Sequence, residues 1–68
     1  MQENETVYER AKRIYGFAEG CLARPYFKGR MLRKKMRRVV RAWDDEPALS
    51  GRTTQLENWL KKNTAALS

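Results

Sequence analysis

Residues 28–46 read KGRMLRKKMRRVVRAWDDE. Eight Lys or Arg residues fall within its first fourteen positions, and three acidic residues close it. At about 100° per residue, its apolar side chains fall within an arc of about 100°, and most of its cations occupy the opposite side. The stretch therefore predicts an amphipathic second helix over about residues 26–43 that buries one side and exposes a cationic one. The apolar strip consists of Leu32, Met36, Val39, Val40 and Trp43.

The acidic run at residues 44–46 marks the end of this helix. Negative charge opposes the helix dipole at a C-terminus and favours it at an N-terminus. We therefore expect the run to lie beyond the second helix and at the start of the next one, where Pro47 suits the first turn. Pro25 likewise suits the first turn of the second helix, and we expect Tyr26 and Phe27 to pack beneath that helix.

A first helix is expected over about residues 6–19. Thr6 followed by Glu9 has the spacing of a capping box, in which hydroxyl and carboxylate each accept a free backbone N–H. Glu9 can also pair with Arg13, and Gly20 is the expected stop. Apolar residues recur at intervals of three and four, as on one helical face. They are Val7, Ala11, Ile14, Tyr15, Ala18 and Leu22.

Two boundaries compete for the third helix. In one version, a short extra turn at about residues 47–50 precedes a break at the SGR sequence of residues 50–52, and the helix covers about residues 54–63 from a second capping-box spacing, Thr54 to Glu57. In the other, a single helix includes that turn and tolerates Gly51. An apolar stripe predicts a helix over 54–63 in both versions, and its members are Leu56, Trp59, Leu60 and Leu67.

The fold class predicted from these patterns is all-α, a compact three-helix bundle. No strand-like alternation, hairpin signal or internal repeat appears. We expect residues 1–68 to form one domain, because so short a chain cannot build two cores, with frayed ends at residues 1–4 and 64–68. Trp43 and Trp59 are expected to be the largest core contributors. Seven aromatic residues and three Met are many for so small a core, and a homodimer would cover any remainder.

Several function classes are disfavoured by composition. Cys21 is the only cysteine and the chain has no His, so an intramolecular disulfide is excluded and a transition-metal site lacks its usual ligands. We expect Cys21 to be a buried apolar residue. The acids show no catalytic pairing and no glycine-rich phosphate loop is present, so we expect no enzyme, no catalytic residue and no cofactor. No apolar run reaches about 18 residues and residues 1–10 are unlike a signal peptide, so we expect a cytoplasmic protein without a membrane partner.

The formal charge of +7 is concentrated in the second helix. The chain has fifteen bases and eight acids, and outside residues 28–41 seven bases are set against the eight acids. A localised charge creates a potential that can steer an anionic partner. Cations spaced three or four residues apart also destabilise a helix by about 0.2 to 0.5 kcal/mol per pair, and no acid lies among them. We therefore favour a functional cationic face over a merely solvated one.

A nucleic acid, DNA or RNA, is the favoured partner, and a regulatory role is expected. Arginine predominates over lysine, and its planar guanidinium suits bidentate contact with phosphate and with the edge of guanine. A helix anchored by its apolar strip can present the other side to a duplex groove or a structured RNA. The predicted binding residues are Lys28, Arg30, Arg33, Lys34, Arg37, Arg38 and Arg41.

The alternative partner is the acidic surface of another protein. A small basic helical domain can act as an adaptor or inhibitor by masking such a surface, and Arg and Trp are favoured interface anchors. DNA, RNA and an acidic protein are therefore three open alternatives at the level of sequence.

Overall fold

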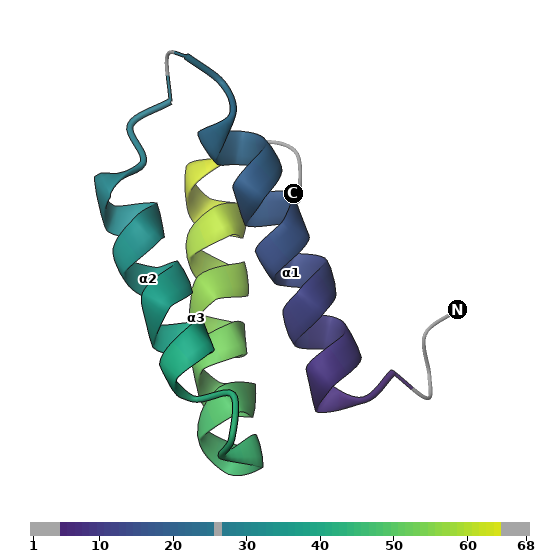
Figure 1. The fold of residues 1–68 in the computed structure, drawn as a ribbon. Helices are drawn as coiled ribbons and strands as arrows, with labels where there is room; N and C mark the ends of the chain where they lie inside the picture. The colour runs from purple at the N-terminus through teal and green to yellow at the C-terminus, as the bar shows by residue number, and fades with distance from the viewer. Residues whose placement is uncertain (1–4, 26, 65–68) are drawn as a thin grey trace.

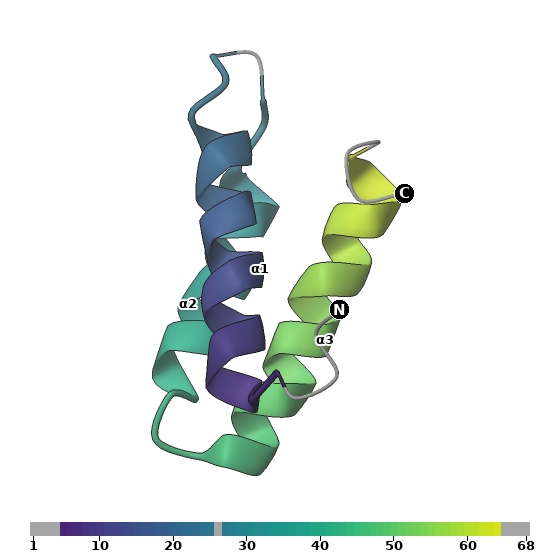
Figure 2. The ribbon, with the colours of Figure 1, turned by 90° about the vertical axis from the view of Figure 1, so that its right-hand side faces the viewer.

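The computed structural model of the chain describes residues 5–25 and 27–64, and these form three helices. The helices are α1 (Val7–Leu22), α2 (Arg30–Arg41) and α3 (Glu46–Asn63). α1 and α2 run antiparallel, and α3 runs back behind them (Figure 1). Seen after a turn of 90°, α3 lies on one side of the α1 and α2 pair (Figure 2). The fold is the predicted all-α three-helix bundle, and the described residues contain no strand.

α3 organises the core, because it packs extensively against both other helices whereas α1 and α2 contact each other much less. Buried side chains recur at intervals of three and four along each helix, as expected of amphipathic helices that share one core. The radius of gyration is 11.7 Å, close to the value of about 11 Å expected for a folded chain of this length. The buried core residues of α3 are Leu49, Thr53, Leu56 and Leu60; those of α1 are Ala11, Ile14, Ala18 and Cys21; those of α2 are Leu32, Met36 and Val39.

The predicted capping box is present at the start of α1. The Glu9 N–H donates to Thr6 Oγ1 at 3.0 Å, and the Thr6 N–H donates to Glu9 Oε1 at 2.8 Å. Glu9 is thus engaged in the cap, and Arg13 pairs instead with Glu5, at 2.8 Å, so the predicted Glu9–Arg13 pair is wrong. Hydrogen bonding from Arg13 lowers the pKa of the Glu5 carboxyl below its ordinary value, against the opposing effect of desolvation.

α1 continues past the predicted end at residue 19. Gly20 lies inside the helix, which ends at Leu22. Cys21 is buried as predicted, and Leu22 packs against the core. The extra turn therefore brings two apolar side chains to the core, and their burial offsets the roughly 1 kcal/mol by which Gly disfavours a helix relative to Ala.

α2 is shorter than the helix predicted over residues 26–43. Pro25 does not open it; instead Pro25 lies in a turn in which the Phe27 N–H donates to the Arg24 carbonyl at 3.1 Å. Proline suits the second position of such a turn. The Phe27 ring then packs edge to face on Trp59, with ring centroids 6.3 Å apart. This contact anchors the connection outside the helix, and α2 begins after it.

Trp43 follows the end of α2 rather than belonging to it. Its ring packs edge to face on Tyr8 with a centroid distance of 5.4 Å. Trp43 and Trp59 are both partly buried and pack against the core, so they flank the fully buried core instead of lying within it. A large indole with a polar N–H suits such a position better than a dry interior. The largest fully buried hydrophobic side chains are aliphatic, namely Ile14, Leu32, Leu49, Leu56, Leu60 and Val39.

α3 is one continuous helix, so the second of the two predicted versions is correct. Asp45 is the N-cap, and its carboxylate accepts a backbone N–H of the first turn at 3.3 Å. The version with a separate turn at residues 47–50 and a helix only over 54–63 is wrong. Gly51 is exposed within the helix, while Leu49 nearby is fully buried with the rest of the α3 core face. Packing of the residues before and after Gly51 therefore keeps the helix continuous at this position, despite the low helix propensity of Gly. The end at Asn63 agrees with the prediction.

Some predictions concern residues outside the described part of the chain. They are the packing of Tyr26, the place of Leu67 on the apolar stripe, and the fraying of residues 1–4 and 65–68. Thr64, which was predicted to fray with the last of these, caps α3, and its N–H donates to the Leu60 carbonyl at 2.8 Å.

The buried hydroxyl of Thr53 yields a test of the core. Thr53 is fully buried, and its Oγ1 has no hydrogen-bond partner among the described residues. Replacing a buried unpaired hydroxyl by a methyl group of the same shape removes a desolvation penalty, so Thr53→Val should stabilise the fold by about 1 kcal/mol. Thermal denaturation should show a rise in Tm of about 4 to 8 °C.

The neighbouring Thr54 provides the matched control. Its Oγ1 accepts a hydrogen bond from Arg10 Nη2 at 3.0 Å. Thr54→Val removes that bond, so it should lower Tm while Thr53→Val raises it. An equal shift in both variants would contradict this account of the Thr53 hydroxyl.

Candidate functional site

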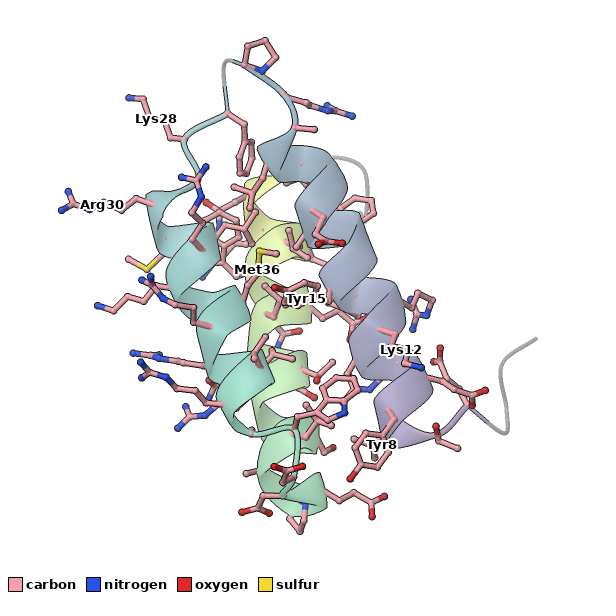
Figure 3. All side chains as sticks on the ribbon, in the orientation of Figure 1. Tyr8, Lys12, Tyr15, Lys28, Arg30 and Met36 are labelled. Atoms are coloured by element: carbon pink, nitrogen blue, oxygen red, sulfur yellow. The ribbon has the colours of Figure 1, made fainter. Side chains whose placement is uncertain are left out.

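The structure brings the predicted binding residues together on one surface, which we call the basic face. All seven side chains are exposed, and the six on α2 fall within an arc of about 140° at about 100° per residue. Lys28 and Arg30 point away from the bundle, on the side of α2 where nitrogen-tipped side chains gather (Figure 3). The basic face consists of Lys28, Arg30, Arg33, Lys34, Arg37, Arg38 and Arg41.

The cations of the basic face form no ion pair with any acid in the described part of the chain, in contrast to cations of α1 and α3. Arg10 pairs with Glu57 at 3.2 Å, Arg13 pairs with Glu5 at 2.8 Å, and Lys61 lies 4.0 Å from Glu57. Glu5 and Glu57 are thus engaged in the fold. The charge of the basic face remains available to an external anion.

The start of α2 strengthens this positive potential. Gly29 is the N-cap and makes no side-chain hydrogen bond to the helix, and the first turn of α2 contains no acid. Free backbone N–H groups and the positive end of the helix dipole therefore lie beside Lys28 and Arg30. An acidic residue in the first turn would offset this potential, and the first turn of α2 contains none.

Arg52 of α3 extends the basic face, and the sequence interpretation missed it. Arg52 is exposed and lines a hollow of about 370 Å³ at the junction of α2 and α3, together with Arg38 and Arg41. Asp45 lies at the same hollow. In one version of the sequence prediction Arg52 fell in a break between helices. Only the antiparallel return of a continuous α3 brings it next to α2, so no local pattern in the sequence could have indicated it.

Val40 departs from the predicted apolar strip of α2. Its side chain is 55% exposed, whereas Leu32, Met36 and Val39 are buried. Val40 lies at the edge of the strip that faces α1, where it lines a hollow between the two helices. The prediction that it belongs to the core is therefore wrong, because α1 does not approach α2 closely enough to cover it.

Two hollows of about 370 and 490 Å³ lie between α1 and α2, and we call them together the α1–α2 groove. Tyr15 and Glu19 line both hollows, so the two follow one another along the helices. Tyr15 and Met36 both point into the space between α1 and α2 (Figure 3). The groove is lined largely by apolar side chains, with cations at its margins. Its cations are Lys12, Arg33 and Arg37.

The described residues hold no group of three or more acidic or cysteine side chains placed to bind a metal ion. None of their helices has both the length and the apolar character needed to cross a membrane.

Comparisons of the chain with family models, with curated proteins and with solved structures find no match. The basic face and the α1–α2 groove are therefore interpreted from their own geometry and charge.

The repulsion among the cations of the basic face should lower the free energy of unfolding, and this effect can be measured. Arg37 has cations three or four residues away at Arg33, Lys34 and Arg41. Each such pair is unfavourable by about 0.2 to 0.5 kcal/mol, so Arg37→Gln should stabilise the fold by about 1 kcal/mol at low ionic strength. The gain should shrink in high salt, where screening weakens the repulsion in both proteins. Chemical denaturation at low and high salt measures both effects.

Lys62→Gln is the control for the loss of one positive charge. Lys62 is exposed on α3, and the positions three and four residues before it, Asn58 and Trp59, are uncharged. This variant should not gain stability. If Arg37→Gln behaves like Lys62→Gln, the cations of α2 do not repel one another appreciably.

Proposed function

We propose that the chain binds a nucleic acid, DNA or RNA, through the basic face. The observation that carries the proposal is a continuous surface of seven exposed cations that no described acid neutralises. Phosphates would replace the repulsion among these cations with attraction and would release condensed counterions into solution. Arginine is the better residue for this task, because its guanidinium can donate two parallel hydrogen bonds to one phosphate.

The dimensions of α2 suit a nucleic-acid groove. At about 1.5 Å per residue, the backbone positions of Arg30 and Arg41 are about 16 Å apart. The major groove of B-DNA is about 12 Å wide, so α2 laid across it can reach phosphates on both strands with its two ends. The middle of the helix would then face the base edges, where contacts carry sequence information. A structured RNA with a bulge or loop presents comparable phosphate walls.

A regulatory role follows from this mode of binding, because occupying the nucleic acid is sufficient to exclude or recruit other factors. The proposal includes no enzymatic activity and no cofactor, and it assigns the chain to the cytoplasm. The alternative is an adaptor or inhibitor whose basic face covers an acidic surface of a partner protein, since the same cations suit carboxylates.

Removing two cations tests the proposal. The double variant Arg37→Ala, Arg41→Ala should weaken binding of a labelled DNA duplex and of a labelled RNA hairpin, measured by fluorescence anisotropy. About five phosphate contacts on B-DNA give a slope of log K against log salt between about −4 and −5. The variant loses two of these contacts, so its slope should be less negative by about 2. Circular dichroism should show an intact fold, because both side chains are exposed.

The matched control is Lys61→Ala, Lys62→Ala, which removes the same charge from the end of α3. It should change the salt slope far less than the α2 variant. Equal losses in the two variants would indicate attraction by net charge alone. Absence of detectable binding at about 50 mM salt would favour the acidic protein partner instead.

A further inference from the structure

The α1–α2 groove lies beside the basic face and shares only Arg33 and Arg37 with it. α3 covers the other side of the α1 and α2 pair (Figures 1 and 2), and none of its described residues lines either hollow. The lack of a third element on this side leaves Val40 55% exposed and Tyr15, Leu22 and Trp43 half-buried. Apolar side chains from both helices are thus aligned along a groove that nothing in the described structure fills.

The shape of the groove suits a helix. Its α1 wall runs from Lys12 to Ala23, a distance of about 16 Å or about three helical turns. Gly16 interrupts this wall: it is exposed, and a Cβ built on it would have no atom within 4 Å. A partner backbone can therefore approach α1 closely at that point. Two antiparallel helices with a third on one side leave the fourth position of a four-helix bundle on the other.

The charge at the groove indicates the chemistry of its occupant. Lys12, Arg33 and Arg37 line its margins, against one acid, Glu19. An occupant that is apolar on one side and acidic beside it would fill the hollows and meet these cations. A second copy of the chain is a poorer match, because each copy carries a formal charge of +7.

We propose that the α1–α2 groove docks an acidic amphipathic helix of a partner protein. The helix occupies the fourth position of the bundle, with its apolar side chains in the two hollows and its carboxylates toward Lys12, Arg33 and Arg37. This is the helix-in-groove mode of recognition, read through apolar anchors spaced three and four residues apart. The proposal does not depend on nucleic-acid binding by the basic face.

The test is a selection from a displayed library of helical peptides of about 18 residues, long enough to span the groove. The full chain is the bait, and binding of each enriched peptide is then measured by titration calorimetry. Enriched peptides should combine apolar residues at helical spacing with neighbouring Asp or Glu. Their affinity should fall as salt rises, because part of it is electrostatic.

Two glycines of α1 supply a matched pair of variants. Gly16→Leu places a large side chain in the groove, whereas Gly20→Leu places the same side chain on an exposed part of α1 outside both hollows. Leu favours a helix over Gly, and neither position has a neighbour that a Cβ would meet, so both variants should fold at least as stably as the wild type. Gly16→Leu should lower the affinity for the peptides by about tenfold or more, and Gly20→Leu should leave this affinity unchanged.

A second pair tests the groove from its α2 wall. Val40 and Met31 are the two exposed large hydrophobic residues of the described chain, at 55% and 50% exposure, and only Val40 lines the groove. Val40→Glu should strongly lower the affinity for the peptides, because it places a carboxylate among apolar side chains and repels an acidic partner. Met31→Glu introduces the same charge on the same helix and should have a small effect.

Several outcomes would overturn the proposal. Enrichment of no peptide, or of peptides without acidic residues, would reject an acidic helical partner. Equal affinities for Gly16→Leu and Gly20→Leu would move the binding site elsewhere. Loss of oligonucleotide binding in Gly16→Leu alone would assign the groove to nucleic acid, and a dimer that dissociates in this variant during sedimentation would assign it to a second copy. Failure of the nucleic-acid proposal would show separately, in the oligonucleotide titrations of the α2 variants.

Discussion

Burial of Leu32, Met36 and Val39 in the shared core holds the cationic helix in the bundle. In isolation α2 would be an unstable helix, because it has only twelve residues and no side-chain N-cap. Isolated helices of about this length are marginal in water. Burying an aliphatic side chain contributes about 1.5 to 3 kcal/mol, whereas each pair of like charges opposes the helix by about 0.2 to 0.5 kcal/mol. Three buried side chains therefore exceed the repulsion along α2. The helix exists because of its packing and can retain a charge that its own sequence does not balance.

The distribution of the acids explains why the basic face and the groove occur together. Arg10 of α1 donates hydrogen bonds to the Ser50 carbonyl, to Thr54 Oγ1 and to Glu57 Oε1, at 3.0 to 3.2 Å. These polar contacts reinforce the packing of α1 on α3, and Asp45 is engaged as the cap of α3. No comparable contact joins α1 to α2 among the described residues. α2 is therefore held mainly from the α3 side, which leaves its cations without acids and its α1 side incompletely covered.

The sequence predicts what depends on periodicity within one helix and misses what depends on contacts between helices. Repeating apolar positions located all three helices, and the basic face follows from the period of α2 alone. Gly20 was predicted to end the first helix, and one of the two versions of the third helix broke at Gly51, yet other helices bury apolar residues near both glycines and so stabilise the helix at these positions. Phe27 was assigned to a helix but is held outside it by Trp59. The groove and the place of Arg52 were missed because both depend on how far apart the helices lie.

The position of Arg33 and Arg37 connects the two proposed sites. Both side chains belong to the basic face, and both line the α1–α2 groove. Carboxylates of a docked helix would neutralise them, so fewer cations would remain for phosphate and the affinity for nucleic acid would fall. By thermodynamic linkage, a bound nucleic acid would lower the affinity of the groove for the partner helix by the same factor. A 68-residue chain could in this way exchange one anionic partner for another without any change of fold, because the competition takes place at two shared side chains.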